Sequence, residues 1–330
     1  MLRSAFLLAL LLVASGCDTT EDEFVALPVV SSVMIAGEAL PEIRLTRLAL
    51  LNTTYDPSAQ AITTGDVRVT RVGADGAPDV EYAYRHAGEG RYVAEDASAQ
   101  VAPGGTYRLH AVVPAPDGIG TDTLRAETLV PPAITIVEPP PAEIVYGQGL
   151  GAPVRLTTSS TADRRAVYLF TARATARDEF EEITVDGDTR WRQRGLPGRF
   201  DPIPASAFFT FADCEVGDDG LATCDTDPAE FDDGASPLLN EDNYEILPDG
   251  TGRITIPFIG IGFYGPQAIT FHSLDDALVD FVETQSLQAN PTTISPGEVP
   301  NVTTNVENGL GLFGSLARVT VTTFVREPGT

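Results

Sequence analysis

The chain has 330 residues, a formal net charge of −26 and a pI near 4.3, and all 21 of its basic residues are arginines. A surface this acidic repels nucleic acid and anionic lipid head groups, which excludes nucleic-acid binding as a function class. The absence of lysine also excludes Schiff-base chemistry and Ser-Lys catalytic dyads.

Residues 1–16 have the pattern of a bacterial lipoprotein signal peptide. Arg3 is followed by an apolar run over residues 5–13, which is too short to span a bilayer as a finished helix. The following Ala14-Ser15-Gly16-Cys17 resembles a lipobox, in which the cysteine thiol carries the diacylglycerol. We expect cleavage before Cys17 and lipidation there; an ordinary secretory signal with a coincidental cysteine is the alternative.

An acidic, flexible tether is expected over residues 17–27 because this segment has too little apolar surface to bury. An aspartate directly after the lipidated cysteine, here Asp18, resembles the inner-membrane retention signal of enterobacteria. Acidic residues at these positions also resemble the surface-export tag of Bacteroidetes-type lipoproteins. The residues alone leave both destinations open.

Residues 28–132 are predicted to form an immunoglobulin-like or transthyretin-like β-sandwich, because short β-rich runs alternate with turn signals. The stretch 102–107 resembles the corner in which a tyrosine, here Tyr107, ties down the turn before a late strand. Strand alternation places His110 on the opposite face from Tyr107, exposed to solvent. Strands are expected at residues 29–36, 43–50, 67–72, 80–84, 107–113 and 123–130.

A proline-dense segment over residues 131–141 predicts a stiff boundary, followed by a second β-rich domain over residues 133–330. Its composition predicts a long, irregular, acidic insertion at 178–249. One helix is expected to begin at Ser273, with Asp276 three residues later and an apolar stripe at helical spacing. Strands are expected at residues 154–158, 166–174, 252–259, 268–272 and 317–325.

Cys214 and Cys224 flank a glycine-rich turn, and in an oxidising envelope compartment this spacing predicts one local disulfide. Two cysteines without a nearby histidine make a poor zinc site. The same loop carries weak candidate calcium ligands, although it lacks the regular EF-hand spacing, and a solvated acidic loop is the alternative. These candidates are Asp218, Asp219, Asp225 and Asp227.

Two segments, 260–265 and 309–314, match the G-x-G-x-x-G pattern of dinucleotide-binding loops. Neither is followed by the helix whose N-terminus would meet a pyrophosphate, so we expect glycine-rich turns linking strands and no cofactor. The chain has three histidines, no H-E-x-x-H and no G-x-S-x-G, and no catalytic residue is predicted. A glycosidase-type carboxylate pair stays open in a chain with 47 acidic residues.

The segment 305–314, Asn-Val-Glu-Asn-Gly-Leu-Gly-Leu-Phe-Gly, closely resembles the end of a Bacteroidetes-type family of outer-membrane lipoproteins with a domain of unknown function (DUF4249-like). The lipobox, segment 36–47, the corner before Tyr107 and the helix before Asn290 agree with this resemblance. Members are often encoded beside TonB-dependent receptors, and the family has no established catalytic residues. The resemblance therefore implies an outer-membrane lipoprotein with a palmitate-bearing anchor.

The leading hypothesis is a non-enzymatic accessory protein that binds a ligand or partner at the outer membrane and assists a TonB-dependent nutrient transporter. One alternative is a structural or adhesive surface module with a calcium-stabilised acidic loop. The other is a hydrolase, which requires two acidic side chains about 5–10 Å apart in an open cleft. The face of the outer membrane stays open, with the surface slightly favoured.

Overall fold

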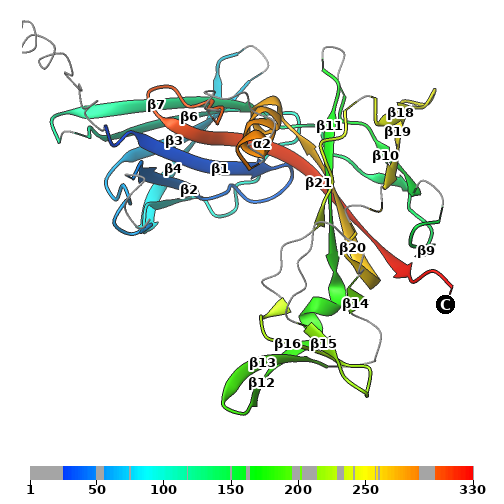
Figure 1. Ribbon diagram of the computed structural model, residues 1–330. Helices are drawn as coiled ribbons and strands as arrows, with labels where there is room; N and C mark the ends of the chain where they lie inside the picture. The colour runs from blue at the N-terminus through cyan, green and yellow to red at the C-terminus, as the bar shows by residue number, and fades with distance from the viewer. Residues whose placement is uncertain are drawn as a thin grey trace, which may run out of the picture.

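The computed structural model shows an all-β protein, and the part of the chain that it describes contains one α-helix (Figure 1). Among the described residues, no helix is long and apolar enough to cross a bilayer. The structure describes residues 25–49, 56–73, 76–116, 118–148, 151–160, 164–194, 201–202, 214–228, 234–240, 242–256, 258, 261–289 and 302–329.

The first part of the chain forms a sheet that curls round one core. Along it the strand order is β21-β1-β2-β5-β4-β3-β6-β7, and a bridge between Arg125 and Glu307 brings β7 back beside the segment before β21. The hydroxyl of Tyr107 accepts a hydrogen bond from the Ala102 amide, which is the corner that the sequence predicts. The strands are β1 (Pro28–Ile35), β2 (Ile43–Arg47), β3 (Asp66–Val72), β4 (Pro78–Gly88), β5 (Arg91–Ala94), β6 (Thr106–Pro114) and β7 (Thr121–Leu129).

The last strand, β21 (Leu310–Arg326), belongs to both halves of the molecule (Figure 1). Its first residues, through Leu316, pair in parallel with β1. From Leu316 onward it pairs antiparallel with β20 (Phe263–Leu274). The first core therefore contains Val306 and Phe313, so the first sandwich is not built from residues 28–132 alone.

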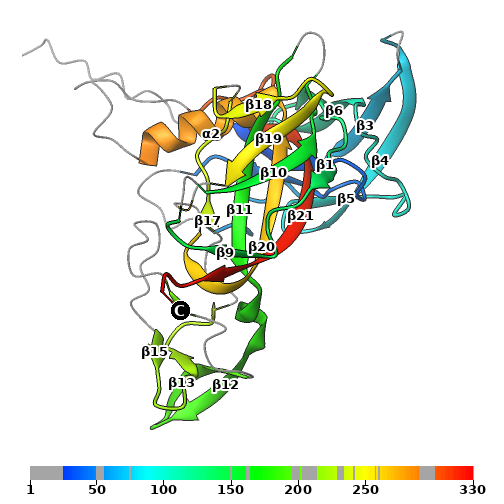
Figure 2. The same ribbon diagram turned by 90° about the vertical axis from the view of Figure 1, so that its right-hand side faces the viewer.

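The second sandwich packs the sheet β17-β11-β20-β21 against the four-stranded sheet β18-β19-β10-β8, and Figure 2 shows these two layers. Its core contains Phe170 and Phe271 from one layer and Leu156 and Ile254 from the other, all completely buried. The strands are β8 (Ile136–Glu138), β9 (Glu143–Val145), β10 (Ala152–Thr157), β11 (Val167–Ala174), β14 (Asp201–Pro202), β17 (Gly234–Ala235), β18 (Tyr244–Ile246) and β19 (Thr251–Ile256), with β9 pairing β21 and β14 pairing β20.

The helix α2 (Asp276–Ala289) begins two residues later than its predicted cap implies. Ser273 is buried near the end of β20, where its hydroxyl contacts that of Ser159. The actual cap is Asp275, whose Oδ1 accepts a hydrogen bond from the Leu278 amide at 2.9 Å. The prediction of the helix was correct and the prediction of its cap was wrong, because the β20 pairing extends through residue 274.

The segment predicted as an irregular insertion contains more regular structure than its composition suggests. A short 3-10 helix, η1 (Thr175–Glu179), leads into a separate sheet of order β12-β13-β16-β15, which projects from the body as an arm (Figures 1 and 2). Later residues of the same segment, in β17 and β18, return to the second sandwich. The arm strands are β12 (Phe180–Val185), β13 (Asp188–Gln193), β15 (Cys214–Val216) and β16 (Ala222–Cys224).

The spacing of the second glycine motif predicts a strand-linking turn at residues 309–314. That prediction was wrong for residues 310–314, which form the start of β21. Gly311 has φ +100°, and a Cβ there would collide with the carbonyl oxygen of Val30 on β1. Glycine is required because the two backbones approach each other too closely for a side chain. In the first motif, Gly265 likewise lies within β20.

Candidate functional site

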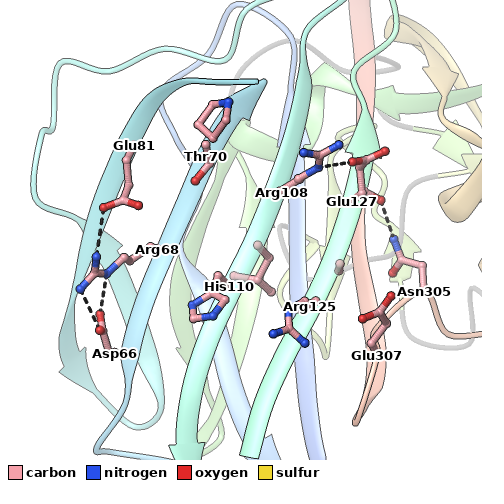
Figure 3. Close-up of a pocket in the computed structure, with 13 residues that line it drawn as sticks. Asp66, Arg68, Thr70, Glu81, Arg108, His110, Arg125, Glu127, Asn305 and Glu307 are labelled. Carbon is pink, nitrogen blue, oxygen red and sulfur yellow. Dashed lines mark hydrogen bonds and ion pairs between the residues drawn. The ribbon is translucent and has the colours of Figure 1, made fainter. Parts of the chain in front are cut away.

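An open hollow of about 820 Å³ lies on the outer face of the first sandwich (Figure 3). It extends across β3, β4, β6 and β7 to the segment just before β21. Its lining consists of Asp66, Arg68, Thr70, Pro78, Glu81, Arg108, Leu109, His110, Arg125, Ala126, Glu127, Asn305 and Glu307.

Strand alternation explains why this face is polar. In β3 the side chains of Val67 and Val69 enter the core, so those of Asp66, Arg68 and Thr70 point outward. Neighbouring strands place their outward residues side by side in two rows across the sheet. One row runs Arg68–His110–Arg125, and the other runs Glu81–Thr70–Arg108–Glu127.

Most charges in the hollow are already paired. Arg68 binds Asp66 at 2.9 Å and Glu81 at 3.2 Å, and Arg108 binds Glu127 (Figure 3). The hydrogen bond from Arg68 holds the pKa of the Asp66 carboxyl below its usual range, so this carboxylate is ionised at neutral pH.

The segment before β21 forms the far wall of the hollow and is fixed by asparagine side chains. The Asn305 amide donates to the backbone oxygens of Glu127 and Phe313 at 3.2 and 2.8 Å, and its Oδ1 accepts from the Phe313 amide at 3.0 Å. Asn308, with φ +59°, donates to the Thr123 carbonyl at 2.9 Å. These hydrogen bonds fix the segment with the most specific family resemblance against β7, and its backbone bridge places Glu307 beside Arg125.

Among the described carboxyl groups, Asp275 has a raised pKa, and it lies away from the hollow. Asp275 is 3% exposed, and burial raises its pKa, although hydrogen bonds from Thr128 and the Leu278 amide partly offset this effect. Thr128 also contacts the Ser315 hydroxyl at 2.6 Å, so this buried group connects β7, α2 and β21. Its position indicates a structural role at the junction of the two sandwiches.

Of the residues singled out from the sequence, only His110 and two members of segment 305–314, Asn305 and Glu307, line the hollow. Cys17 lies outside the described residues. Cys214 and Cys224 form a disulfide in the arm, the pairing expected from their spacing. His110 is exposed on β6, as strand alternation predicts.

Two of the four candidate calcium ligands, Asp219 and Asp225, have other partners in the arm. Asp219 accepts a hydrogen bond from the Leu221 amide and pairs with Arg192, while Asp225 pairs with Arg190 at 3.0 Å. Asp218 lies in the exposed turn between β15 and β16, and Asp227 follows β16. Within the described ranges, no group of three or more His, Cys, Asp or Glu residues could hold a metal ion.

Comparison with known families gives a match over nearly the whole chain. The model of the domain of unknown function DUF4249 matches residues 18–322. The chain belongs to the DUF4249 family. No curated protein matches this DUF4249 chain. Among solved structures, the I-band fragment I67-I69 from titin aligns with 93% of this chain and 100% of that fragment, at 10% identity and a TM-score of 0.19, which is too low to carry an argument.

Proposed function

We propose that this DUF4249 protein is a non-enzymatic, lipid-anchored accessory protein of the outer membrane, which binds a ligand or partner for a TonB-dependent nutrient transporter. The observation that carries this proposal is the hollow, an open concave surface on a rigid sheet lined by ordered charged side chains. Rigid strands hold such groups in place for recognition without a moving part.

The pairing of the charges favours binding over hydrolysis. A glycosidase needs one carboxyl group that stays protonated, and therefore a raised pKa beside a second, ionised carboxylate. Asp66 and Glu81 share the open hollow, but both bind Arg68, and the pKa of Asp66 is lowered. This arrangement supports a binding surface with fixed charges.

The anchor and the location rest on the N-terminal sequence. Lipidation at Cys17 would attach the chain to the outer membrane through the tether, with the cell surface slightly favoured over the periplasmic face. The calcium-stabilised adhesive module has no comparable support, because Asp219 and Asp225 already bind arginines. Replacing Cys17 by serine should release the protein from the membrane fraction.

Co-purification from membranes solubilised in mild detergent tests the accessory role. The full chain should be recovered with a β-barrel receptor. Thr70→Trp, which fills the hollow while keeping a good strand-forming residue, should reduce that recovery. Thr121→Trp is the matched control, because Thr121 is exposed at the start of β7 outside the hollow. Recovery of the wild-type chain without any β-barrel partner would contradict the proposal.

A further inference from the structure

Arg125 differs from the other two arginines in the hollow. Arg68 and Arg108 each bind carboxylates, whereas the Arg125 guanidinium makes no ion pair within 4.0 Å among the described residues. Its backbone is fixed on both sides, by pairing with His110 on β6 and by the bridge to Glu307. Within the part of the chain that the structure describes, no carboxylate engages the planar fork of donors that Arg125 holds at a fixed place in the hollow.

His110 is the direct cross-strand partner of Arg125, and both side chains lie on the outer face of the sheet (Figure 3). Cβ atoms of such pairs lie about 4.5–5.5 Å apart, so one small group can contact both side chains. We propose that Arg125 and His110 form a carboxylate-binding subsite in the hollow. This inference rests on the proposed binding function and names the chemistry of the ligand.

The charge of the lining selects a carboxylate over a more highly charged anion. Three arginines in the hollow face four carboxylates, and the whole chain carries a net charge of −26. A phosphate dianion would be repelled by these carboxylates, whereas a singly charged, planar carboxylate matches one guanidinium fork. The carboxylate can belong to a peptide or to a sugar acid.

Glu307 sets the affinity of this subsite. It lines the same end of the hollow beside Arg125, and it makes no ion pair within 4.0 Å among the described residues. A ligand carboxylate must approach Arg125 against the negative charge of Glu307. Removal of that charge should tighten binding, whereas removal of the Arg125 charge should weaken it.

The test uses the full mature chain in mild detergent, with the ring protons of its three histidines followed by NMR. The probes are N-acetyl-trialanine with a free carboxylate, the same peptide with a C-terminal amide, and galacturonate. The acids should shift the His110 signal, which His110→Gln identifies. Arg125→Gln should weaken acid binding about tenfold, Arg125→Lys less, and Glu307→Gln should tighten it about twofold.

Arg85→Gln is the matched control, because Arg85 is an exposed arginine of β4 that does not line the hollow. If both acids shift the His110 signal, the subsite binds carboxylates in general. If only one does, that result shows whether the ligand carboxylate belongs to a peptide or to a sugar acid. Equal binding of the amide, equal losses in Arg125→Gln and Arg85→Gln, or no response to either acid overturns the subsite. Co-purification with a receptor is measured separately, so the accessory role can survive the loss of this inference.

Discussion

The junction between the two sandwiches and the projecting arm are stabilised by different means. At the junction one strand, β21, takes part in both sandwiches, its Gly311 lies against the β1 backbone, and the buried Asp275 connects three elements. Among the described residues, the arm strands contribute only Phe180, Ala222 and the disulfide-bonded Cys224 to a small buried cluster, which is completed at the base of the arm by residues of β11, η1 and β20. The junction depends on backbone packing, whereas the arm depends on a covalent bond.

This difference predicts how far the effect of a destabilising substitution extends through the molecule. Residues of β21 contribute to both large cores, so a change near Leu316 affects both sandwiches at once. The arm forms a sheet of its own, so a change there should remain local.

Gly311→Ala should have the largest effect. The new Cβ meets the Val30 carbonyl, and φ at this position is +100°, so steric overlap and left-handed backbone strain add. We expect the free energy of unfolding to fall by about 3–5 kcal/mol, with both sandwiches unfolding together. Chemical denaturation followed by far-UV circular dichroism, with hydrogen exchange read separately in the strands of each sandwich, measures this loss; the single tryptophan, Trp191, lies in the arm and does not report on the sandwiches.

Gly37→Ala is the control for that variant, since Gly37 also has a positive φ (+80°) but no atom within 4 Å of the added Cβ. It should cost only about 1–2 kcal/mol, the price of the backbone conformation alone. Equal losses in the two variants would show that the close approach of β1 and β21 contributes nothing.

Removal of the arm disulfide should come next in size, but its effect should be local. Cys214→Ser with Cys224→Ser opens a loop of ten-residue separation, which should destabilise the arm by about 3 kcal/mol. Hydrogen exchange should become faster in β12, β13, β15 and β16, with the unfolding midpoint of the sandwiches unchanged. A fall in that midpoint equal to the loss in the arm would contradict the separation of the two regions.

His272 on β20 tests the second sandwich under acid conditions. Burial, with a smaller contribution from Arg318, lowers its pKa from 6.5 to about 4, and the Thr171 hydroxyl contacts its Nε2. The unfolded chain therefore binds a proton below pH 6.5 that the folded chain excludes, and stability falls as the pH drops from 6.5 towards 4. At pH 5 this amounts to about 2 kcal/mol.

His272→Gln should flatten this part of the stability profile relative to the wild type. Denaturation at pH 7 and at pH 5 measures the difference, and carboxylates elsewhere cancel because both proteins contain them. His110→Gln is the control, because His110 is exposed. If the free energy of unfolding falls by the same amount from pH 7 to pH 5 in His272→Gln and in the wild type, protonation of His272 does not destabilise the folded protein.

The fold was predictable where local patterns determine it. Alternation along residues 107–113 predicted the outward position of His110, and the Tyr107 corner and the helix followed from short-range signals. The shared strand was not predictable, because the parallel pairing of β1 with β21 joins residues about 280 positions apart. The glycines of 309–314 looked like a turn because sequence spacing does not reveal the backbone that passes beside them.

The hollow was missed because its residues come from four strands and a distant segment. A signal was present, since polar side chains, several of them charged, recur at alternate positions: 66, 68 and 70 in β3, 106, 108 and 110 in β6, and 121, 123, 125 and 127 in β7. That alternation predicts polar outward faces, but it does not specify which strands are neighbours. The order β4-β3-β6-β7 brings these charges together.

The smallest effect is expected from the exposed ion pairs. Arg108 with Glu127 in the hollow and Arg190 with Asp225 in the arm should each contribute less than about 1 kcal/mol, because water and salt screen exposed charges. Double-mutant cycles with glutamine or asparagine replacements measure the coupling of each pair. If the coupling energy of the hollow pair is no larger than that of the arm pair, the paired charges of the hollow are not needed for folding. Their fixed arrangement then serves recognition. A much larger coupling in the hollow would make these charges part of the sandwich's stability and weaken the argument for a binding surface.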